Sequence, residues 1–272
     1  MAAPGCGAVS GFGIRRRIRQ MIPQRRQKKA LKEIGMLNFL GIGAQKAGTT
    51  WLYERLRLHP GLAFPAGKEI HFWNQSRHYG LDWYRGRFAD SGGSNGEITP
   101  AYAILAPEII REIHREFPDL RLIYTIRNPI SRAWSSAKME MRRAGMEPDE
   151  TSDQWFIDHF RSPGSLARGD YLSCIRNWRA VYPAEQLQVL RFEDIQERPL
   201  QVLEACCRHL GVPGGVWEDG PGIREKVFSS GNEPLRSSLR PALLDLYWDR
   251  ILSLSDYLGQ DLSAWLAEGR MP

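Results

Sequence analysis

The stretch at residues 37–58, LNFLGIGAQKAGTTWLYERLRL, decides the fold. It opens with an apolar run at 37–42 and then breaks into a turn bracketed by Gly43 and Gly48. From residue 51 onward, apolar side chains recur at helical spacing. This order predicts a strand, a turn and a helix. Such a turn directs backbone N–H groups and a helix N-terminus at one point, which attracts phosphate or sulfate.

The turn differs from a nucleoside triphosphate loop of the Walker type, G-x-x-x-x-G-K-[ST]. Gly43 and Gly48 keep the glycine spacing, but Thr49 stands where the Walker lysine would open the helix. The lysine of this turn, Lys46, lies midway along the loop, beside the position of a bound anion. The spacing therefore predicts an anion site for a different ligand. The alternative is a glycine-rich turn without a ligand, which the combination of glycines, lysine and threonines disfavours.

The segment GAQKAGTTWL, residues 43–52, resembles the 5′-phosphosulfate loop of sulfotransferases that use 3′-phosphoadenosine 5′-phosphosulfate (PAPS). The resemblance implies that this loop binds the sulfuryl donor. It also implies that Lys46 stabilises the charge that develops as the sulfuryl group leaves. The donor-binding residues that it implies in the loop are Gly43, Gln45, Lys46, Ala47, Gly48, Thr49 and Thr50.

A second informative stretch covers residues 120–139, LRLIYTIRNPISRAWSSAKM. Its first seven residues predict a buried parallel strand, and Pro129 is placed to open a helix. Arg127 at the strand end and Ser135 two turns into the helix can converge on one phosphate. The alternative is an ordinary turn with a surface arginine.

This stretch resembles the family motif R-N-P-x-x-R-A-x-S, which binds the 3′-phosphate of PAPS. Arg127 and Ser135 match that motif residue by residue. Two phosphate motifs in this order, roughly eighty residues apart, are a specific signal. Because the 3′-phosphate distinguishes PAPS from ATP and ADP, the pair of motifs implies PAPS as the donor and PAP as the product.

The segment KEIHFWN, residues 68–74, places a carboxylate and an imidazole two residues apart. If the segment is extended, Glu69 and His71 point the same way, and either could accept a proton from an acceptor hydroxyl. A structural role for both is the alternative. The segment resembles the K/S-E-x-H-F-F sequence of heparan sulfate sulfotransferases, which implies that Glu69 is the general base and His71 a supporting group. Asn74 replaces the aspartate often found there.

Three further segments carry weaker signals. EITPAY, residues 97–102, resembles the family's E-K-T-P-x-Y, but Ile98 replaces a lysine, which implies a different acceptor. Tyr171 lies in a segment that resembles G-x-Y-x-x-x-L-x-x-W, which implies a place near the nucleotide, with a core tyrosine as the alternative. Trp83 and Tyr84 are expected to pack in the core rather than on a sugar. The candidates for closing the 3′-phosphate site near the C-terminus are Lys226, Ser230, Gly231 and Arg236.

Composition and charge limit the possible fold and the possible classes of ligand. The chain has 272 residues, of which 42% are apolar, which is enough for the core of one α/β domain. The net charge of +6 suits an anionic cofactor, an acidic acceptor, nucleic acid or a membrane surface, and does not choose among them. The four cysteines lack metal-ligand spacing, which predicts free thiols in a reducing compartment.

Residues 1–35 differ from the rest, with small residues and glycines followed by many arginines and lysines. No apolar stretch in the sequence is long enough for a signal peptide or a transmembrane segment. We interpret 1–35 as a basic N-terminal extension. The favoured interpretation is a solvated segment. The alternative is a segment that contacts an anionic lipid or polymer.

The sequence therefore predicts a single P-loop-like α/β domain over residues 36–272, with a doubly wound parallel sheet flanked by helices. The resemblance implies a PAPS-dependent sulfotransferase that acts, without a metal, on a hydroxyl of a carbohydrate or glycan. We expect a bacterial, cytoplasmic enzyme with no transmembrane segment. Two alternatives are a magnesium-dependent P-loop kinase of a small metabolite and a non-catalytic protein that binds polyanions. Nucleic acid is not expected as a partner, because no paired aromatic RNA motif is present.

Deletion of residues 1–32 tests the role of the basic extension. If it contacts a membrane or a polyanion, the deletion lowers retention on anionic liposomes or a heparin column, because the lost cations carry the attraction. Unchanged retention would exclude this contact.

Overall fold

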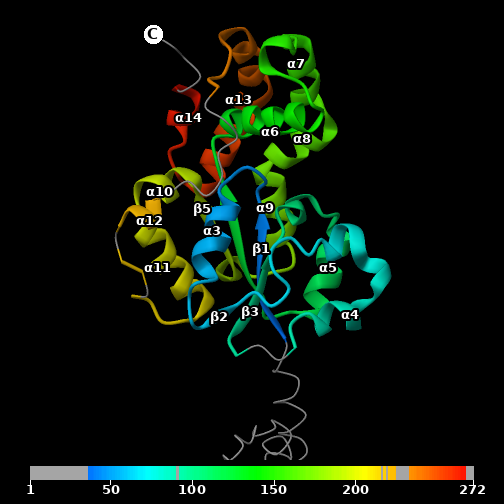
Figure 1. Ribbon diagram of the computed structural model, residues 1–272, viewed down its shortest axis with the longest axis vertical. Helices are drawn as coiled ribbons and strands as arrows, with labels where there is room; N and C mark the ends of the chain where they lie inside the picture. Colours follow the sequence, from blue (N-terminus) through cyan, green and yellow to red (C-terminus); the bar gives the residue numbers. More distant parts are fainter. Residues whose placement is uncertain (1–35, 90–91, 216, 219, 225–232, 268–272) are drawn as a thin grey trace, which may run out of the picture.

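The computed structural model describes residues 36–89, 92–215, 217–218, 220–224 and 233–267. The predicted basic extension, 1–35, lies outside these residues. The centre of the molecule is a parallel sheet with strand order β2-β3-β1-β4-β5 (Figure 1). Its strands are β1 (Leu37–Gly43), β2 (Leu62–Ala63), β3 (Ser94–Ile98), β4 (Arg121–Ile126) and β5 (Leu187–Arg191).

Helices cover both faces of the sheet. On one face Phe39, Ile98 and Ile123 pack against α3 (Thr49–Leu56) and α11 (Pro199–Leu210). On the other face, Leu40 and Tyr124 belong to a larger core. Both faces are apolar because successive side chains of a strand point to opposite sides and neither side meets water. The helices nearest the first face are α3 (Thr49–Leu56), α10 (Phe192–Glu197), α11 (Pro199–Leu210) and α12 (Pro221–Arg224).

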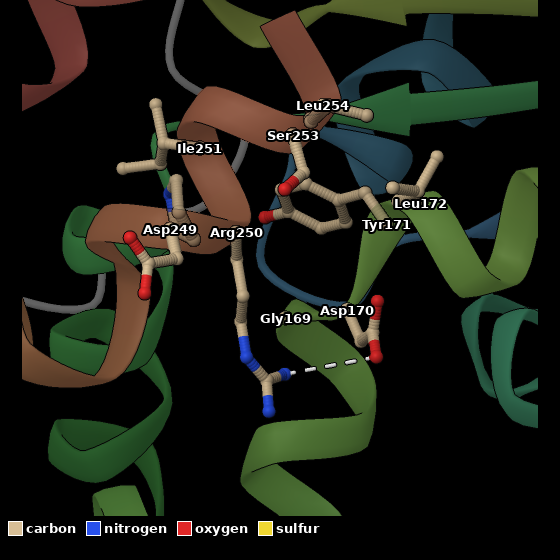
Figure 2. A pocket seen from close by; sticks show the side chains of 10 residues that line it. Gly169, Asp170, Tyr171, Leu172, Asp249, Arg250, Ile251, Ser253 and Leu254 are labelled. Carbon is tan, nitrogen blue, oxygen red and sulfur yellow. Dashed lines mark ion pairs between the residues drawn. The ribbon is translucent and has the colours of Figure 1, made fainter. Parts of the chain in front are cut away.

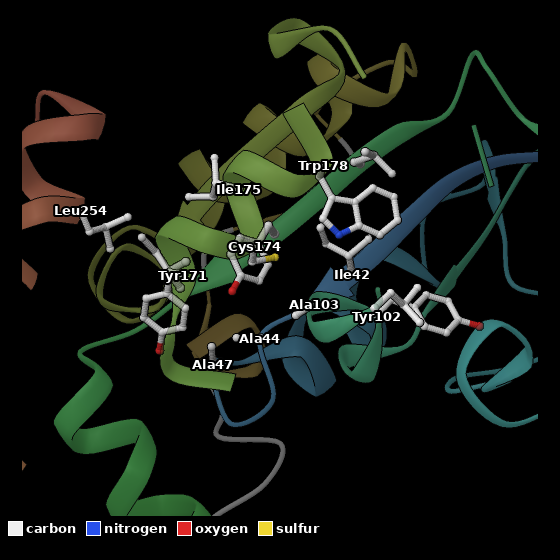
Figure 3. Close-up of a cluster of buried hydrophobic side chains, with 14 of the residues drawn as sticks. Ile42, Ala44, Ala47, Tyr102, Ala103, Tyr171, Cys174, Ile175, Trp178 and Leu254 are labelled. Atoms are coloured by element: carbon white, nitrogen blue, oxygen red, sulfur yellow. The ribbon is translucent and has the colours of Figure 1, made fainter. Parts of the chain in front are cut away.

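The second face carries the main hydrophobic core, which includes α5 (Pro107–Glu116), α6 (Pro129–Arg143), α9 (Tyr171–Arg179) and α13 (Arg240–Leu258). Figure 3 shows part of it, with Ile42 of β1, Ala103 of the short 3-10 helix η3 (Pro100–Ile104) and Trp178 of α9. The helices on this side and beyond the sheet are α4 (Leu81–Gly86), α5 (Pro107–Glu116), α6 (Pro129–Arg143), α7 (Asp153–Arg161), α8 (Pro163–Gly169), α9 (Tyr171–Arg179), α13 (Arg240–Leu258) and α14 (Ser263–Ala267).

The predicted fold class, a doubly wound parallel sheet flanked by helices, is confirmed. The strand, turn and helix expected at 37–58 are present, although the helix begins at Thr49 and ends at Leu56 rather than spanning 51–58. Pro129 opens α6, as its fixed backbone angle favours, and Tyr84 is fully buried, as expected.

A close approach between β3 and β1 fixes one position of the sheet. Gly96 pairs with Phe39, and a β-carbon at Gly96 would collide with the Phe39 ring. At Gly86, in the last turn of α4, an added β-carbon would meet nothing within 4 Å.

We therefore predict that Gly96→Ala lowers the free energy of unfolding by about 1–3 kcal/mol, because the core must shift to accept the methyl group. The matched variant Gly86→Ala should be neutral or stabilising by up to about 1 kcal/mol, since alanine loses less backbone entropy than glycine in a helix. Urea denaturation measures both. Equal effects of the two substitutions would contradict this packing.

Candidate active site

The candidate site lies where three neighbouring parallel strands end. β3, β1 and β4 are adjacent in the sheet, so the segments that follow their last residues meet at one edge. The loop after β1 is fastened to the end of β4 by two hydrogen bonds. The Ala44 N–H donates to the Thr125 carbonyl at 2.7 Å, and the Thr125 hydroxyl donates to the Gly43 carbonyl at 2.8 Å.

The turn into α3 depends on Gly48. Its φ of +86° is left-handed, and a β-carbon there would lie 2.8 Å from Cδ2 of Phe192. Gly48 is the N-cap of α3, and no side chain caps this helix end. The N–H groups of the first helical turn, from Thr49 onward, have no carbonyl partner within the helix. They are therefore free of helical bonds and aligned for an anion.

The other predicted loop residues take different positions. Gln45 and Thr50 are partly exposed, whereas Thr49 is buried. Ala47 is buried, and its N–H donates to the Ala44 carbonyl at 3.2 Å, so this amide closes the turn itself. The loop thus combines a rigid inner turn with outward-facing groups at its two ends.

Arg127 joins the two predicted phosphate motifs. Its Nη1 donates to the Lys46 carbonyl at 3.2 Å, and its guanidinium lies 4.6 Å from the centroid of the Phe192 ring. Asn128 begins α6 by accepting the Ile130 N–H on its side-chain oxygen at 3.0 Å. Ser135 follows on α6, where it is buried. The fold therefore brings the 43–50 loop and the start of α6 into direct contact.

Positive charge dominates the surroundings of Lys46. Burial lowers the pKa of its ammonium group, and cationic neighbours lower it further. Those neighbours are Arg127, Arg143, Arg142 and Lys138, in decreasing order of effect. A group of cations around a partly buried lysine disfavours its charged form, and a bound anion would relieve that repulsion.

Backbone conformation singles out the same residues. Among the described residues, the non-glycine positions with positive φ are Lys46 at 69°, Glu69 at 64° and His71 at 57°. A left-handed conformation costs about 1–2 kcal/mol for a residue with a β-carbon. Such strain persists where surrounding contacts impose it, and it concentrates at functional sites. All three residues were assigned catalytic roles from the sequence.

Glu69 and His71 lie side by side. The segment is not extended, since both residues are left-handed, so the condition under which their side chains were expected to point the same way is not met. His71 Nε2 nonetheless lies 3.5 Å from Glu69 Oε2, and His71 Nδ1 is 3.2 Å from the Asn74 side-chain oxygen. Lys68 also pairs with Glu69. A carboxylate and an imidazole in contact, both partly exposed, can take up a proton from an approaching hydroxyl.

Tyr171 lies beside the start of α6, because Pro129 lines the same pocket and Arg127 is among the groups that, after burial, shift the pKa of its hydroxyl. It is buried, its ring centroid lies 6.1 Å from that of Tyr124, and burial raises the pKa of its hydroxyl. It lines a pocket of about 180 Å³ between the start of α9 and α13, where Arg250 lies 3.8 Å from Asp170 (Figure 2). No residue of the 43–50 loop lines this pocket. The alternative of a core tyrosine fits this position, and a place near the nucleotide stays a prediction.

Two supporting residues, Phe192 and Lys138, were not predicted from the sequence. Phe192 packs against both Gly48 and Arg127, and no local pattern could connect residues so far apart. Lys138 is buried one turn after Ser135, and its ammonium donates to the Glu233 carbonyl at 3.0 Å. The spacing of three residues along a predicted helix was the available signal.

Of the residues suggested for closing the site, Lys226, Ser230 and Gly231 lie outside the described residues. Arg236 donates to the Thr151 carbonyl at 2.9 Å and to the Asp153 carboxylate at 2.7 Å. These contacts give Arg236 a structural role. Within the described part of the chain, no helix is both long and apolar enough to cross a membrane, and no group of three His, Cys, Asp or Glu side chains could hold a metal.

Comparison with known proteins agrees with this geometry. The family model described as the sulfotransferase domain matches residues 38–221, which include the 43–50 loop, Glu69 and Arg127. The chain belongs to the sulfotransferase family. A sulfotransferase from Alicyclobacillus acidocaldarius has a similar structure, with a TM-score of 0.67 and 25% identity over 85% of this chain and 99% of that one.

Several curated relatives of this chain are named as heparan sulfate sulfotransferases. Mouse heparan sulfate glucosamine 3-O-sulfotransferase 6 is 36% identical over 214 residues, covering 73% of this chain and 54% of that protein. The Xenopus laevis bifunctional heparan sulfate N-deacetylase/N-sulfotransferase 1 is 28% identical over 84% of this chain and 30% of its own length. The chain thus spans about half or less of these relatives.

The repulsion around Lys46 gives a testable stability effect. Lys46→Met should raise the free energy of unfolding at neutral pH, and this gain should shrink as salt screens the charges. In the unaltered protein the folded pKa of Lys46 lies below the unfolded value of 10.5, so the unfolded state binds more protons between those two pH values. Stability therefore rises with pH across that interval, and the variant should lose this rise.

Urea denaturation at low and high salt measures the effect of Lys46→Met. Arg111→Met, which removes an exposed cation on α5, is the control and should show little change. Loss of stability in Lys46→Met at low salt would contradict the account of the charges.

Proposed function

We propose that this protein transfers the sulfuryl group of PAPS to a hydroxyl group of a carbohydrate or glycan. The observation that carries the proposal is the contact between Arg127 and the Lys46 carbonyl, 3.2 Å long, which unites two anion-binding elements in one site. A donor with phosphate groups at both its 5′ and 3′ positions matches two such elements. The positive charge around Lys46 matches the multiple negative charges of PAPS.

The residues present fit the donor as follows. The amides at the start of α3 and the Lys46 ammonium hold the 5′-phosphosulfate end, and Arg127 with Ser135 holds the 3′-phosphate. PAPS supplies an activated sulfuryl group and leaves as PAP. Lys46 stabilises negative charge at the departing oxygen, since a preorganised cation acts most strongly in a site with little water. In this proposal positive charge comes from side chains and amides rather than from a metal.

The acceptor hydroxyl loses its proton to the Glu69–His71 pair. Glu69 is the proposed base, and His71, in contact with it at 3.5 Å, fixes the orientation of its carboxylate. The Glu69 side chain is 39% exposed, so an acceptor can reach it. Both residues have a left-handed backbone, so their side chains point in directions that differ from those in an extended segment.

A glycan acceptor is supported by the relatives named above. Ile98, which stands where the glycosaminoglycan enzymes have a lysine, is fully buried against Gly41. It therefore offers no polar contact to an acceptor, and we propose a glycan other than the one those enzymes modify. Nitrogen is the second candidate acceptor, because one relative is an N-sulfotransferase.

The buried free thiols Cys174, Cys206 and Cys207 fit a cytoplasmic, reducing location.

Calorimetric titration without magnesium tests the donor. PAP should bind more tightly than ADP or adenosine 5′-phosphosulfate, because only PAP fills the 3′-phosphate position. Arg127→Ala should weaken PAP binding by at least about tenfold, as expected when a charge-assisted contact of about 1.5–3 kcal/mol is lost. Lys46→Ala should weaken it similarly.

Arg111→Ala, an exposed arginine paired with Glu108 on α5, is the matched control and should leave PAP affinity unchanged. Equal affinity for PAP and ADP would contradict the proposal. Preferential binding of magnesium–ATP would then favour the kinase alternative.

The base is tested by Glu69→Gln. Its kcat should fall by about 10²–10⁴-fold, the usual contribution of a general base, while PAP affinity stays the same. His71→Ala should have a smaller effect if His71 supports Glu69. A larger loss in His71→Ala would assign the base to His71 instead.

A further inference from the structure

Glu97 is a fully buried carboxylate at the end of β3 that the proposed mechanism does not use. It accepts hydrogen bonds from the hydroxyls of Tyr84, of Tyr102 at 3.0 Å and of Thr99 at 2.9 Å. Burial raises the pKa of this carboxyl group, and the hydroxyl donors act in the opposite direction. A buried carboxylate is expensive unless its oxygens are satisfied, so these three hydroxyls are part of the same structural unit.

This unit reaches the segment that carries Glu69 and His71. The Ile70 N–H donates to the Glu97 carboxylate. The Glu69 N–H donates to the carbonyl of Ile98 at 3.1 Å. The Trp73 N–H lies 3.4 Å from the Tyr102 hydroxyl, which itself binds Glu97.

Ring packing reinforces these bonds. Phe72 stacks on Tyr84 with centroids 4.4 Å apart and an angle of 11° between the rings. Trp73 meets the same tyrosine edge-on at 5.6 Å. Residues 69–73 are therefore held by several contacts, with Glu97, with Tyr84 and Tyr102, and with Ile98.

These contacts hold a segment whose backbone is strained. Ile70 lies between two left-handed residues, Glu69 and His71. Each left-handed residue disfavours the turn, so the turn needs contacts that are lost when it relaxes. A hydrogen bond to a buried charge is among the strongest of such contacts and offsets part of this strain.

We propose that Glu97 is a positioning residue: its buried carboxylate, through Ile70 and Tyr102, holds the 69–73 turn so that Glu69 and His71 face the acceptor. The part of this inference that concerns the acceptor rests on the proposed function. Glu97 itself is fully buried, so an acceptor cannot reach it directly. An ionised carboxylate only accepts hydrogen bonds, and the Ile70 amide and the three hydroxyls each supply a donor to it.

Glu97→Gln tests this role with little change in volume. One carboxylate oxygen becomes an amide NH₂, which cannot accept the hydrogen bonds made there. Hydrogen exchange of a peptide covering residues 68–74 should speed up by about tenfold or more, the effect of losing at least about 1.4 kcal/mol of local stability. Exchange in the 43–50 loop should not change. Glu112→Gln, at an exposed carboxylate paired with Arg77, is the control.

Kinetics separate positioning from general support. Glu97→Gln should lower kcat by about 10–10²-fold, as a misplaced catalytic group does, with unchanged PAP affinity. In a Glu69→Ala background, the same substitution should lower kcat by less than about twofold, because residues acting as a unit are not additive. Full additivity of the two substitutions, or a parallel loss of PAP affinity, would overturn the proposal.

Hydrogen exchange decides the structural part without any turnover. If the protein neither binds PAP nor transfers sulfuryl groups, the proposed function fails, while exchange at 68–74 still reports whether Glu97 holds the turn. Unchanged exchange in Glu97→Gln would overturn the positioning role whatever the activity. If Glu97→Gln does not fold, Tyr102→Phe removes the hydroxyl that bridges Glu97 and the Trp73 N–H, and its exchange at residues 68–74 then gives the same decision.

Discussion

The site depends on a repulsive interaction: Lys46 and Arg127 are both cationic, yet the fold holds them against each other. The Arg127 guanidinium donates to the Lys46 carbonyl at 3.2 Å, and the groups that most strongly shift the pKa of Lys46, after burial, are other cations. Such an arrangement is unfavourable in the free protein and becomes favourable when an anion enters. This arrangement follows from the parallel sheet. Because β1 and β4 are neighbours, the loops that begin at their C-terminal ends lie next to each other.

The fold can tolerate like charges and backbone strain at this site because the rest of the molecule has a well-packed apolar core. Apolar side chains cover both faces of the sheet, and α6 begins at a proline with an asparagine cap. The unfavourable features are confined to one edge: like charges around Lys46 and left-handed backbone at Lys46, Glu69 and His71. Repulsion and strain therefore coincide with the residues to which donor binding and proton transfer are assigned. Arg127, Phe192 and the Glu97 unit are the contacts that keep these features in place.

The parts of the site that could be predicted from sequence are those encoded within one strand, turn and helix. The 43–50 loop and the Arg127-to-Ser135 stretch each fall within about twenty residues, so spacing alone was informative. Glu69 and His71 were named from their spacing, but their left-handed backbone could not be predicted, because it is imposed by tertiary contacts rather than by local preference. Phe192, Lys138 and the tyrosines around Glu97 act across long sequence separations. A single sequence carries no pattern for such contacts.

The most direct test of the two-element site is a crystal structure of the protein with PAP. The account predicts the 5′-phosphate at the N-terminus of α3 beside Lys46, and the 3′-phosphate between Arg127 and Ser135 in the same complex. A nucleotide whose 5′-phosphate does not reach the N-terminus of α3 would contradict it. So would a complex in which the 3′-phosphate touches neither Arg127 nor Ser135.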